Sequence, residues 1–192
     1  ENASPAYVRE HHSFQNLIPR MLALMSTAPD PKAFYDNVMN KKLGDDYEYA
    51  RWNAHPLLAA QYRMMVDMMH RIVVPKVKHA RRVLEVGPGP GTWTRILLEE
   101  NPHAAYTLVD ISHEMLAHAR ENLANYSNIS YQETDLHDFK SSEPFDFFFS
   151  SRAIEYMPDK RAVVQKIARM LLPGAEGAIV TKMPKPFFDS IR

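Results

Sequence analysis

The sequence has no cysteine among its 192 residues. This absence excludes disulfide bonds, thiolate zinc sites and any reaction that needs a cysteine nucleophile. Neither sign of charge is in excess, because 23 Lys and Arg residues balance 23 Asp and Glu residues. Domains that bind nucleic acid usually carry a basic excess, so the composition gives no strong nucleic-acid signal. No apolar run approaches the roughly 20 residues of a membrane span and no signal peptide is visible, so we expect a cytoplasmic protein.

Glycine is also scarce, with six residues in the whole chain. Three of these nevertheless lie within five positions, at Gly87, Gly89 and Gly91, in the stretch VLEVGPGPGTWT (residues 83–94). A turn needs one or two glycines, so this density indicates that something other than protein comes close to the backbone. The alternative interpretation is a tight turn between a strand and a helix.

Residues 1–80 differ in composition from the rest of the chain, because they are rich in Met, Tyr, His and Pro. Apolar residues at helical spacing predict a long amphipathic helix over residues 57–77, with Pro75 disturbing its end. Further helices are expected over residues 14–26 and 30–39, so residues 1–80 form a helical lid or cap region in this interpretation. Four methionines of the long helix are expected in the core, or alternatively in the wall of an apolar ligand pocket: Met64, Met65, Met68 and Met69.

From residue 82 onward, apolar strands alternate with amphipathic helices. This alternation is typical of a parallel sheet covered on both faces, so we expect residues 81–192 to form a doubly wound, Rossmann-like α/β domain. Ligands of such sheets bind beyond the carboxyl ends of the strands, near the switch in strand order. Strands are expected over residues 82–86, 104–110, 129–134, 145–151 and 177–183, and helices over residues 92–101, 112–126 (opened by Ser112) and 159–174 (closed by Gly174).

The three glycines lie at the carboxyl end of the first predicted strand, where backbone approaches a bound ligand. A dinucleotide-binding loop reads G-x-G-x-x-G, and its third glycine would fall on Thr92. The observed pattern E-x-G-x-G-x-G begins at Glu85 and resembles motif I of the class I S-adenosylmethionine-dependent methyltransferases. The resemblance extends over about residues 82–182 and points to the small-molecule and lipid branch of that family. It implies S-adenosylmethionine as the cofactor, and not NAD.

Asp110 ends the second predicted strand, 19 positions after Gly91. A carboxylate there can accept hydrogen bonds from both hydroxyls of a ribose, and the resemblance assigns it that role. The alternative is an acid at the N-terminus of the following helix, beside Ser112. The resemblance implies further cofactor contacts: Ile111 and Met115 at the adenine ring, Asp135 and the amide of Leu136 at the adenine edge, Glu85 near the methionine amino group, and Ser150, Ser151 and Arg152 along the methionine moiety.

Methyl transfer from a sulfonium is an in-line displacement, which needs alignment above all and a base only if the nucleophile is protonated. Glu155 and Tyr156 are expected to face the acceptor, although Glu155 could instead be a solvated loop acid. His137 is a further candidate base, as is the pair His11 and His12. No metal site is expected, because the histidines are scattered and serines follow the fourth strand, where a catechol-type magnesium site would need carboxylates.

The sequence thus predicts a methyltransferase for a small-molecule, lipid or sugar-like acceptor, with residues 47–58 closing over the cofactor. It lacks the Asn-Pro-Pro-Tyr and Asp-Pro-Pro-Tyr elements expected for methylation of adenine in DNA. One alternative is a non-catalytic S-adenosylmethionine-binding regulatory or assembly subunit, and another is an RNA-directed enzyme, which net neutrality disfavours. The sheet of the family normally continues for two more strands. We therefore expect those strands to be absent here, so that either the sequence is a fragment of a longer protein, or a partner chain or further domain completes the sheet.

Overall fold

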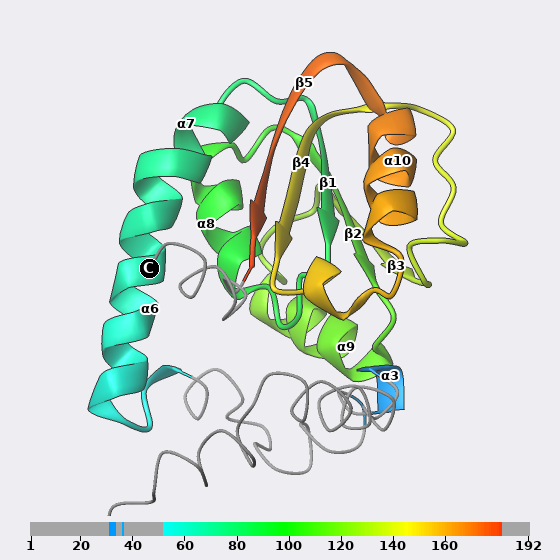
Figure 1. The fold of residues 1–192 in the computed structure, drawn as a ribbon. Coiled ribbons are helices and arrows are strands. Elements are labelled where there is room, and N and C mark those ends of the chain that lie inside the picture. The colour runs from blue at the N-terminus through cyan, green and yellow to red at the C-terminus, as the bar shows by residue number, and fades with distance from the viewer. Residues whose placement is uncertain (1–30, 34–35, 37–51, 182–192) are drawn as a thin grey trace, which may run out of the picture.

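A computed structural model describes residues 31–33, 36 and 52–181. These residues form a parallel sheet in the order β3-β2-β1-β4-β5, with helices on both faces (Figure 1). The predicted Rossmann-like α/β fold is therefore confirmed. The predicted helix over residues 14–26, most of the one over residues 30–39, and the pair His11 and His12 lie outside the described residues. The strands are β1 (Arg82–Val86), β2 (Ala105–Asp110), β3 (Ile129–Glu133), β4 (Phe145–Ser151) and β5 (Leu171–Val180).

The long helix predicted over residues 57–77 is present as three consecutive segments, α6 (Pro56–Met68), the π-helical η3 (Met69–Val73) and α7 (Val74–Val77). The amide of Val74 donates to the carbonyl oxygen of Met69, five residues earlier. This widened turn comes just before Pro75, which has no N–H to continue the regular ladder.

The four methionines of this helix do not share one environment. Met69 is completely buried, and Met65 and Met68 pack against the core, as expected. Met64 is 72% exposed, so its predicted core position is wrong.

The remaining helices are α3 (Pro31–Ala33), α8 (Thr92–Glu100), α9 (His113–Asn122), η4 (Ile154–Tyr156) and α10 (Lys160–Met170). Ser112 caps α9 as predicted, because its Oγ accepts a hydrogen bond of 3.2 Å from the Met115 amide. No helix among the described residues is both long enough and apolar enough to cross a membrane.

The end of α10 differs from the prediction, which closed the helix at Gly174. The helix ends at Met170, and Leu171 already pairs with Phe145 as the first residue of β5. Pro173 explains the early end, since a residue that precedes proline is driven out of the helical region into extended backbone. Gly174 instead adopts a positive φ of 82° inside β5, where the register with β4 is irregular.

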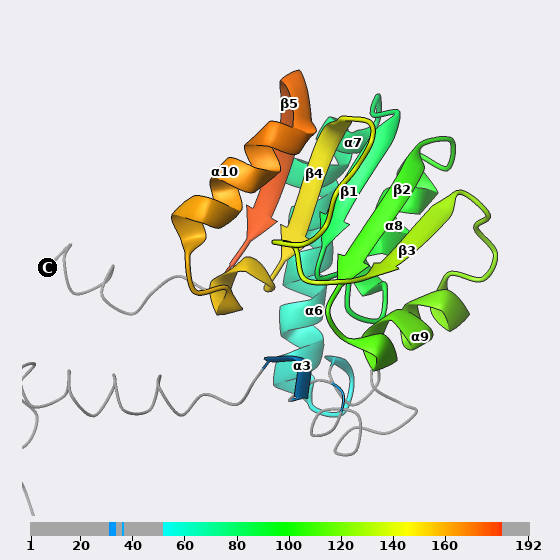
Figure 2. The same ribbon diagram turned by 90° about the vertical axis from the view of Figure 1, so that its right-hand side faces the viewer.

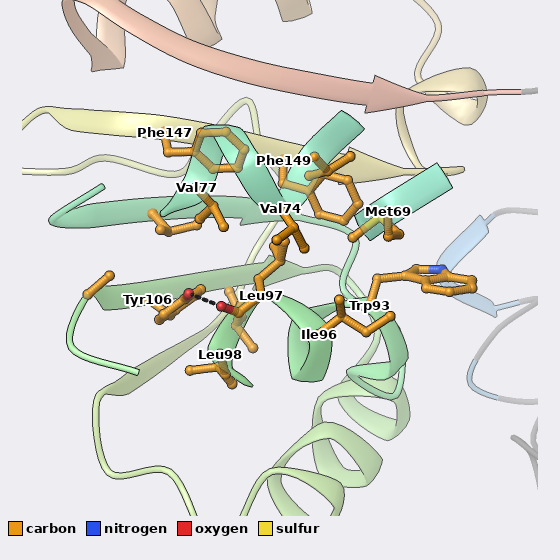
Figure 3. Close-up of a cluster of buried hydrophobic side chains, with 14 of the residues drawn as sticks. Met69, Val74, Val77, Trp93, Ile96, Leu97, Leu98, Tyr106, Phe147 and Phe149 are labelled. Carbon is orange, nitrogen blue, oxygen red and sulfur yellow. Dashed lines mark hydrogen bonds between the residues drawn. The ribbon is translucent and has the colours of Figure 1, made fainter. Parts of the chain in front are cut away.

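Two hydrophobic cores lie on opposite faces of the sheet. The first joins the sheet to α6, η3, α7 and α8, and Figure 3 shows its centre, including the hydrogen bond of 2.9 Å from the Tyr106 hydroxyl to the Leu97 carbonyl. The second lies beneath α10, which covers the other face in Figure 2. Consecutive residues of β4 serve both cores, because Phe147 and Phe149 enter the first and Phe148 enters the second.

Three aromatic rings close the first core at its edge. Trp52, Tyr62 on α6 and Trp93 on α8 lie with their ring centroids 5.4–5.7 Å apart. Such contacts stabilise beyond the burial of their area by about 0.5–1.5 kcal/mol per pair. The trio therefore fixes α6 against the first turn of α8.

Candidate functional site

The predicted site residues within the described part of the chain lie at the carboxyl ends of β1, β2, β3 and β4, or directly after them. Parallel strands bring all these ends to one edge of the sheet, at the bottom of Figure 1. The chain leaves β1 toward β2 on one side, whereas β4 flanks β1 on the other. This is a topological switch point, where open α/β sheets bind their ligands.

The three glycines of the loop after β1 differ in what surrounds them. A Cβ atom on Gly87 would lie 2.1 Å from the Cβ of Ala153, and one on Gly91 would lie 2.8 Å from the Cδ1 of Leu123. Close protein contacts therefore account for the absence of a side chain at these two positions. Gly89 has a φ of 57°, and a Cβ there would meet nothing within 4 Å. Gly89 is thus the point of the loop that borders open space.

Asp110, the last residue of β2, binds the glycine loop that follows β1. Its Oδ2 accepts a hydrogen bond of 3.3 Å from the Gly89 amide, and its Oδ1 accepts one of 3.0 Å from the Ser112 amide. Burial raises the pKa of Asp110 to about 6, against the opposing effect of these backbone donors. The carboxyl therefore has a structural role at the start of α9 and also retains acceptor capacity beside the open side of the loop.

Glu85 lies in β1, two residues before Gly87, and is completely buried. Neither of its carboxyl oxygens has a hydrogen-bond partner. Burial, above all, raises its pKa to about 8, with a further increase from the charge of Asp110. The hydroxyl of Thr94 on α8 lies close enough to lower this pKa, but the two groups do not meet hydrogen-bond geometry, and the Thr94 oxygen is unpartnered as well. Buried polar groups normally have partners, so this pair indicates a ligand or water that completes it.

Two serines at the end of β4 have different surroundings. Ser150 is buried and donates a hydrogen bond of 2.8 Å to the Val86 carbonyl, which ties β4 to β1. The Ser151 hydroxyl has no partner, although its residue is only 9% exposed. Ser150 therefore supports the sheet, whereas Ser151 adds a third unpartnered polar group to this edge.

Arg152 follows with a φ of 64°, which is unusual for a residue with a side chain. Its amide donates to the Val180 carbonyl at 2.7 Å, and its Nε donates to Glu155 Oε1 at 2.8 Å. The other oxygen of Glu155 accepts a hydrogen bond of 2.9 Å from Thr181. These contacts make Glu155 a link between the ends of β4 and β5, while Tyr156 beside it is 49% exposed.

His137, the other predicted base, belongs to a separate group after β3. Its amide and its ring Nδ1 both contact Asp135 Oδ1, at 2.7 and 2.9 Å. Burial alone would raise the pKa of Asp135, but the hydrogen bonds and charge of His137, together with Lys166, lower it. The His137 carbonyl accepts a hydrogen bond from Lys166 on α10.

The residues predicted to flank an adenine ring lie around the ends of β2 and β3. Ile111 is partly exposed, and its carbonyl accepts a hydrogen bond of 2.6 Å from Lys32. Met115 and Leu136 are already buried by protein atoms, each with 2% exposure. The Leu136 side chain is part of the second core, so only its backbone is offered to a ligand.

Sequence reasoning missed Thr94, Lys32 and Asp36. Thr94 carried a weak signal, since it is a polar residue on the buried face of α8 directly after the glycine loop. Lys32 and Asp36 carried none, because nothing in their spacing connects them with a turn that lies more than 70 residues away. Within the described residues, no group of three His, Asp or Glu side chains could hold a metal ion.

Comparisons with known proteins agree with this geometry. Residues 83–174 match a family model described as a methyltransferase domain. The trans-aconitate 2-methyltransferase of Azoarcus sp. (strain BH72) is 29% identical over 143 residues, which cover 74% of this chain and 51% of that protein. The enzyme of the same name from Methylobacterium nodulans is 31% identical over 134 residues, which cover 66% and 49%. The chain thus spans about half the length of the curated relatives it matches.

Among solved structures, the chain resembles the N-methyltransferase NodS from Bradyrhizobium japonicum WM9 in complex with S-adenosyl-L-homocysteine. The TM-score is 0.57 at 20% identity, over 76% of this chain and 71% of that one. At this identity the likeness concerns the fold. Over residues 83–174, this chain is thus similar to the class I S-adenosylmethionine-dependent methyltransferases in sequence and in fold.

Proposed function

We propose that the protein binds S-adenosylmethionine at the carboxyl edge of its sheet and transfers the methyl group to a small-molecule acceptor. The observation that carries the proposal is the buried, unpartnered carboxyl of Glu85 beside the open space at Gly89. An unpartnered acid at this depth requires a donor or a positive charge. The ammonium of a methionine moiety supplies both, so the residues present fit this cofactor.

The other polar groups of the edge fit the remaining parts of the cofactor. Asp110 would accept from the ribose hydroxyls, since its carboxyl oxygens keep lone pairs beyond the backbone amides that they already bind. Asp135 and the Leu136 amide suit the adenine edge, between Ile111 and Met115. The proposed contacts of the methionine half and of the glycine loop are Glu85, Gly87, Gly89, Gly91, Ser151 and Arg152.

The bound cofactor supplies a methyl group on a sulfonium sulfur, which is already electrophilic. The chain then has to align the acceptor and exclude water. Glu155 holds Arg152 through Nε, so we propose that it acts by positioning this guanidinium and not as a base. Tyr156 and His137 stay candidate bases, and a base is needed only for an acceptor that arrives protonated.

A carboxylate is the acceptor that the site favours. Carboxylates are ionised at neutral pH and attack without a base, and Arg152 provides a guanidinium at the end of β4 on a side chain that is 31% exposed. The curated relatives described above are named for trans-aconitate, which is a carboxylic acid. NodS is named as an N-methyltransferase, so an amine is the second acceptor to test. A lipid or sugar-like acceptor is the third.

We further propose that residues 1–80 assist this site as a cap over the cofactor domain formed by residues 81–192. Lys32 already contacts the turn after β2, which supports this role. The two regions pack against each other at their boundary near residue 80, because Met69, Val73 and Val77 belong to the first core. We also propose that a partner chain or a further domain completes the sheet beside its edge strand β5.

The test has a binding step and a transfer step. Titration calorimetry with S-adenosylmethionine, S-adenosylhomocysteine and NAD should give heat for the first two ligands alone. Labelled methyl transfer should then be measured to trans-aconitate, other carboxylates, amines and lipids, and an ester product would be released by mild base whereas a methylamine would not. NAD binding without a response to the sulfonium compound overturns the cofactor assignment. Cofactor binding without transfer to any acceptor favours the non-catalytic subunit.

A further inference from the structure

A contact between distant parts of the chain lies directly beside the proposed cofactor site. Figure 1 shows α3 next to the N-terminal end of α9. Lys32 on α3 donates from Nζ to the Ile111 carbonyl at 2.6 Å, across 79 positions of sequence. The same ammonium pairs with Asp36 at 3.3 Å and Glu133 at 3.4 Å. Lys32 therefore joins the turn after β2 to the end of β3.

Asp36 contacts the other half of the same turn. Its carboxylate accepts hydrogen bonds from the Ser112 hydroxyl and from the Glu114 amide, at the start of α9. Burial would raise the pKa of Asp36, but the bonds from Ser112 and Lys32 lower it, so the group is held as a carboxylate. A negative charge at the N-terminus of α9 is favourable to the helix.

Lys32 and Asp36 therefore hold the turn from both sides: Lys32 binds the carbonyl of Ile111, and Asp36 binds the hydroxyl of the next residue, Ser112. The Ser112 amide is one of the backbone donors that hold Asp110, and the Gly89 amide is another. A shift of this turn would therefore move Asp110 away from the glycine loop and change where Ile111 lies.

We propose that Lys32 and Asp36 are positioning residues for the nucleoside half of the cofactor site, holding the turn of residues 110–112 in the form that presents Asp110 and Ile111. The proposal rests on the proposed function, since it assigns residues toward that cofactor. Binding of the nucleoside and docking of Lys32 and Asp36 then stabilise one another, as linkage requires.

Simple stabilisation of the fold would have a different consequence. The side chain of Lys32 is 45% exposed and that of Asp36 is 20% exposed. Ion pairs as accessible as this contribute little to global stability. Their loss should therefore appear in ligand affinity and only weakly in the unfolding midpoint.

The experiment uses the full chain with Lys32→Met and Asp36→Asn. The matched control is Lys76→Met, which removes an exposed ion pair of 2.7 Å with Glu176 away from the carboxyl edge. Calorimetry with S-adenosylhomocysteine and with adenosine alone should give threefold to tenfold weaker binding for both test variants. The control should stay within about twofold of the parent, and the unfolding midpoints without ligand should shift by similar small amounts in all three. Lys32→Arg should recover most of the affinity.

A double-mutant cycle tests the route through Asp110. In an Asp110→Asn background, Lys32→Met should cost clearly less affinity than in the parent, because the group that it positions is already altered. Additive losses would overturn the proposal, as would test variants that bind like the control. If the parent itself fails to bind S-adenosylhomocysteine, the proposed function falls together with this inference. Unchanged affinity in variants of a binding parent rejects the inference alone.

Discussion

Replacing Glu85 by Gln should change how the stability of the ligand-free protein depends on pH. The ordinary pKa of this carboxyl is 4.5, and burial raises it to about 8 in the folded chain. A buried acid of this kind favours folding only while it is protonated. Its contribution is complete below about pH 4.5 and is lost as the pH rises through about 8, because the unfolded chain releases its proton first.

The size of the effect follows from the two pKa values of Glu85. Each unit of difference is about 1.4 kcal/mol, so the loss between pH 4.5 and 8 amounts to about 4–5 kcal/mol. That is a large share of the roughly 5–15 kcal/mol by which domains are stable. The amide of Gln has nearly the same shape and cannot ionise, so Glu85→Gln should flatten the curve.

Urea unfolding between pH 6 and 8 is the assay. Asp110 has a pKa of about 6, so its own loss of stability falls mostly below this window. The free energy of unfolding of Glu85→Gln, minus that of the parent, should rise by about 1 kcal/mol per pH unit. Asp110→Asn is the comparison variant: it should flatten the curve below pH 6 and keep a smaller slope in this window, because the charge of Asp110 contributes to the raised pKa of Glu85. If parent and Glu85→Gln lose stability in parallel from pH 6 to 8, the carboxyl is hydrated or paired and the reasoning fails.

Three further predictions concern the ligand. S-adenosylhomocysteine should displace a proton from Glu85 when it binds at pH 7, so calorimetry in buffers of different ionisation enthalpy should detect proton release in the parent and much less in Glu85→Gln. Gly87→Ala and Gly89→Ala introduce similar strain at positive φ, but only the first meets a protein atom, Ala153, at 2.1 Å. Thermal unfolding should therefore penalise Gly87→Ala more, and a Gly89→Ala variant that binds S-adenosylhomocysteine as tightly as the parent would contradict the role of Gly89. Asp110→Ala should weaken binding at least tenfold, by about 1.4 kcal/mol or more. A 2′-deoxyribose analogue should lose affinity for the parent but little more for this variant, and a full further loss there would place the ribose elsewhere.

The sheet could be predicted because its information is local. Each strand is a short apolar run followed by a turn or helix signal, and β4 is almost uninterrupted from Phe145 to Phe149. The position of Glu85, Gly89 and Asp110 at one edge follows from parallel topology alone. Their environment does not, since the missing partner of Glu85 depends on how α8 packs over β1.

The errors and omissions arise where distant residues decide the outcome. Gly174 suggested a helix end, but pairing between Leu171 and Phe145 starts β5 three residues earlier. Glu155 was expected to face the acceptor or to be a solvated loop acid, and neither interpretation foresaw that Arg152 and Thr181 donate to its oxygens. The pairing of Leu171 and the hydrogen bonds of Glu155 produce no periodic pattern in the sequence, because both depend on contacts between separate elements.

The aromatic trio at the start of α8 has a practical consequence. Trp52 and Trp93 are the two tryptophans of the chain, and they contact each other edge to face. Trp93 comes two residues after Gly91 and is only 7% exposed. Indole fluorescence of these 192 residues therefore originates where α6 meets the helix that begins at the glycine loop. Ultraviolet excitation can thus follow movement at this junction without any attached dye, and Tyr62→Phe would alter the emission while keeping the ring stack.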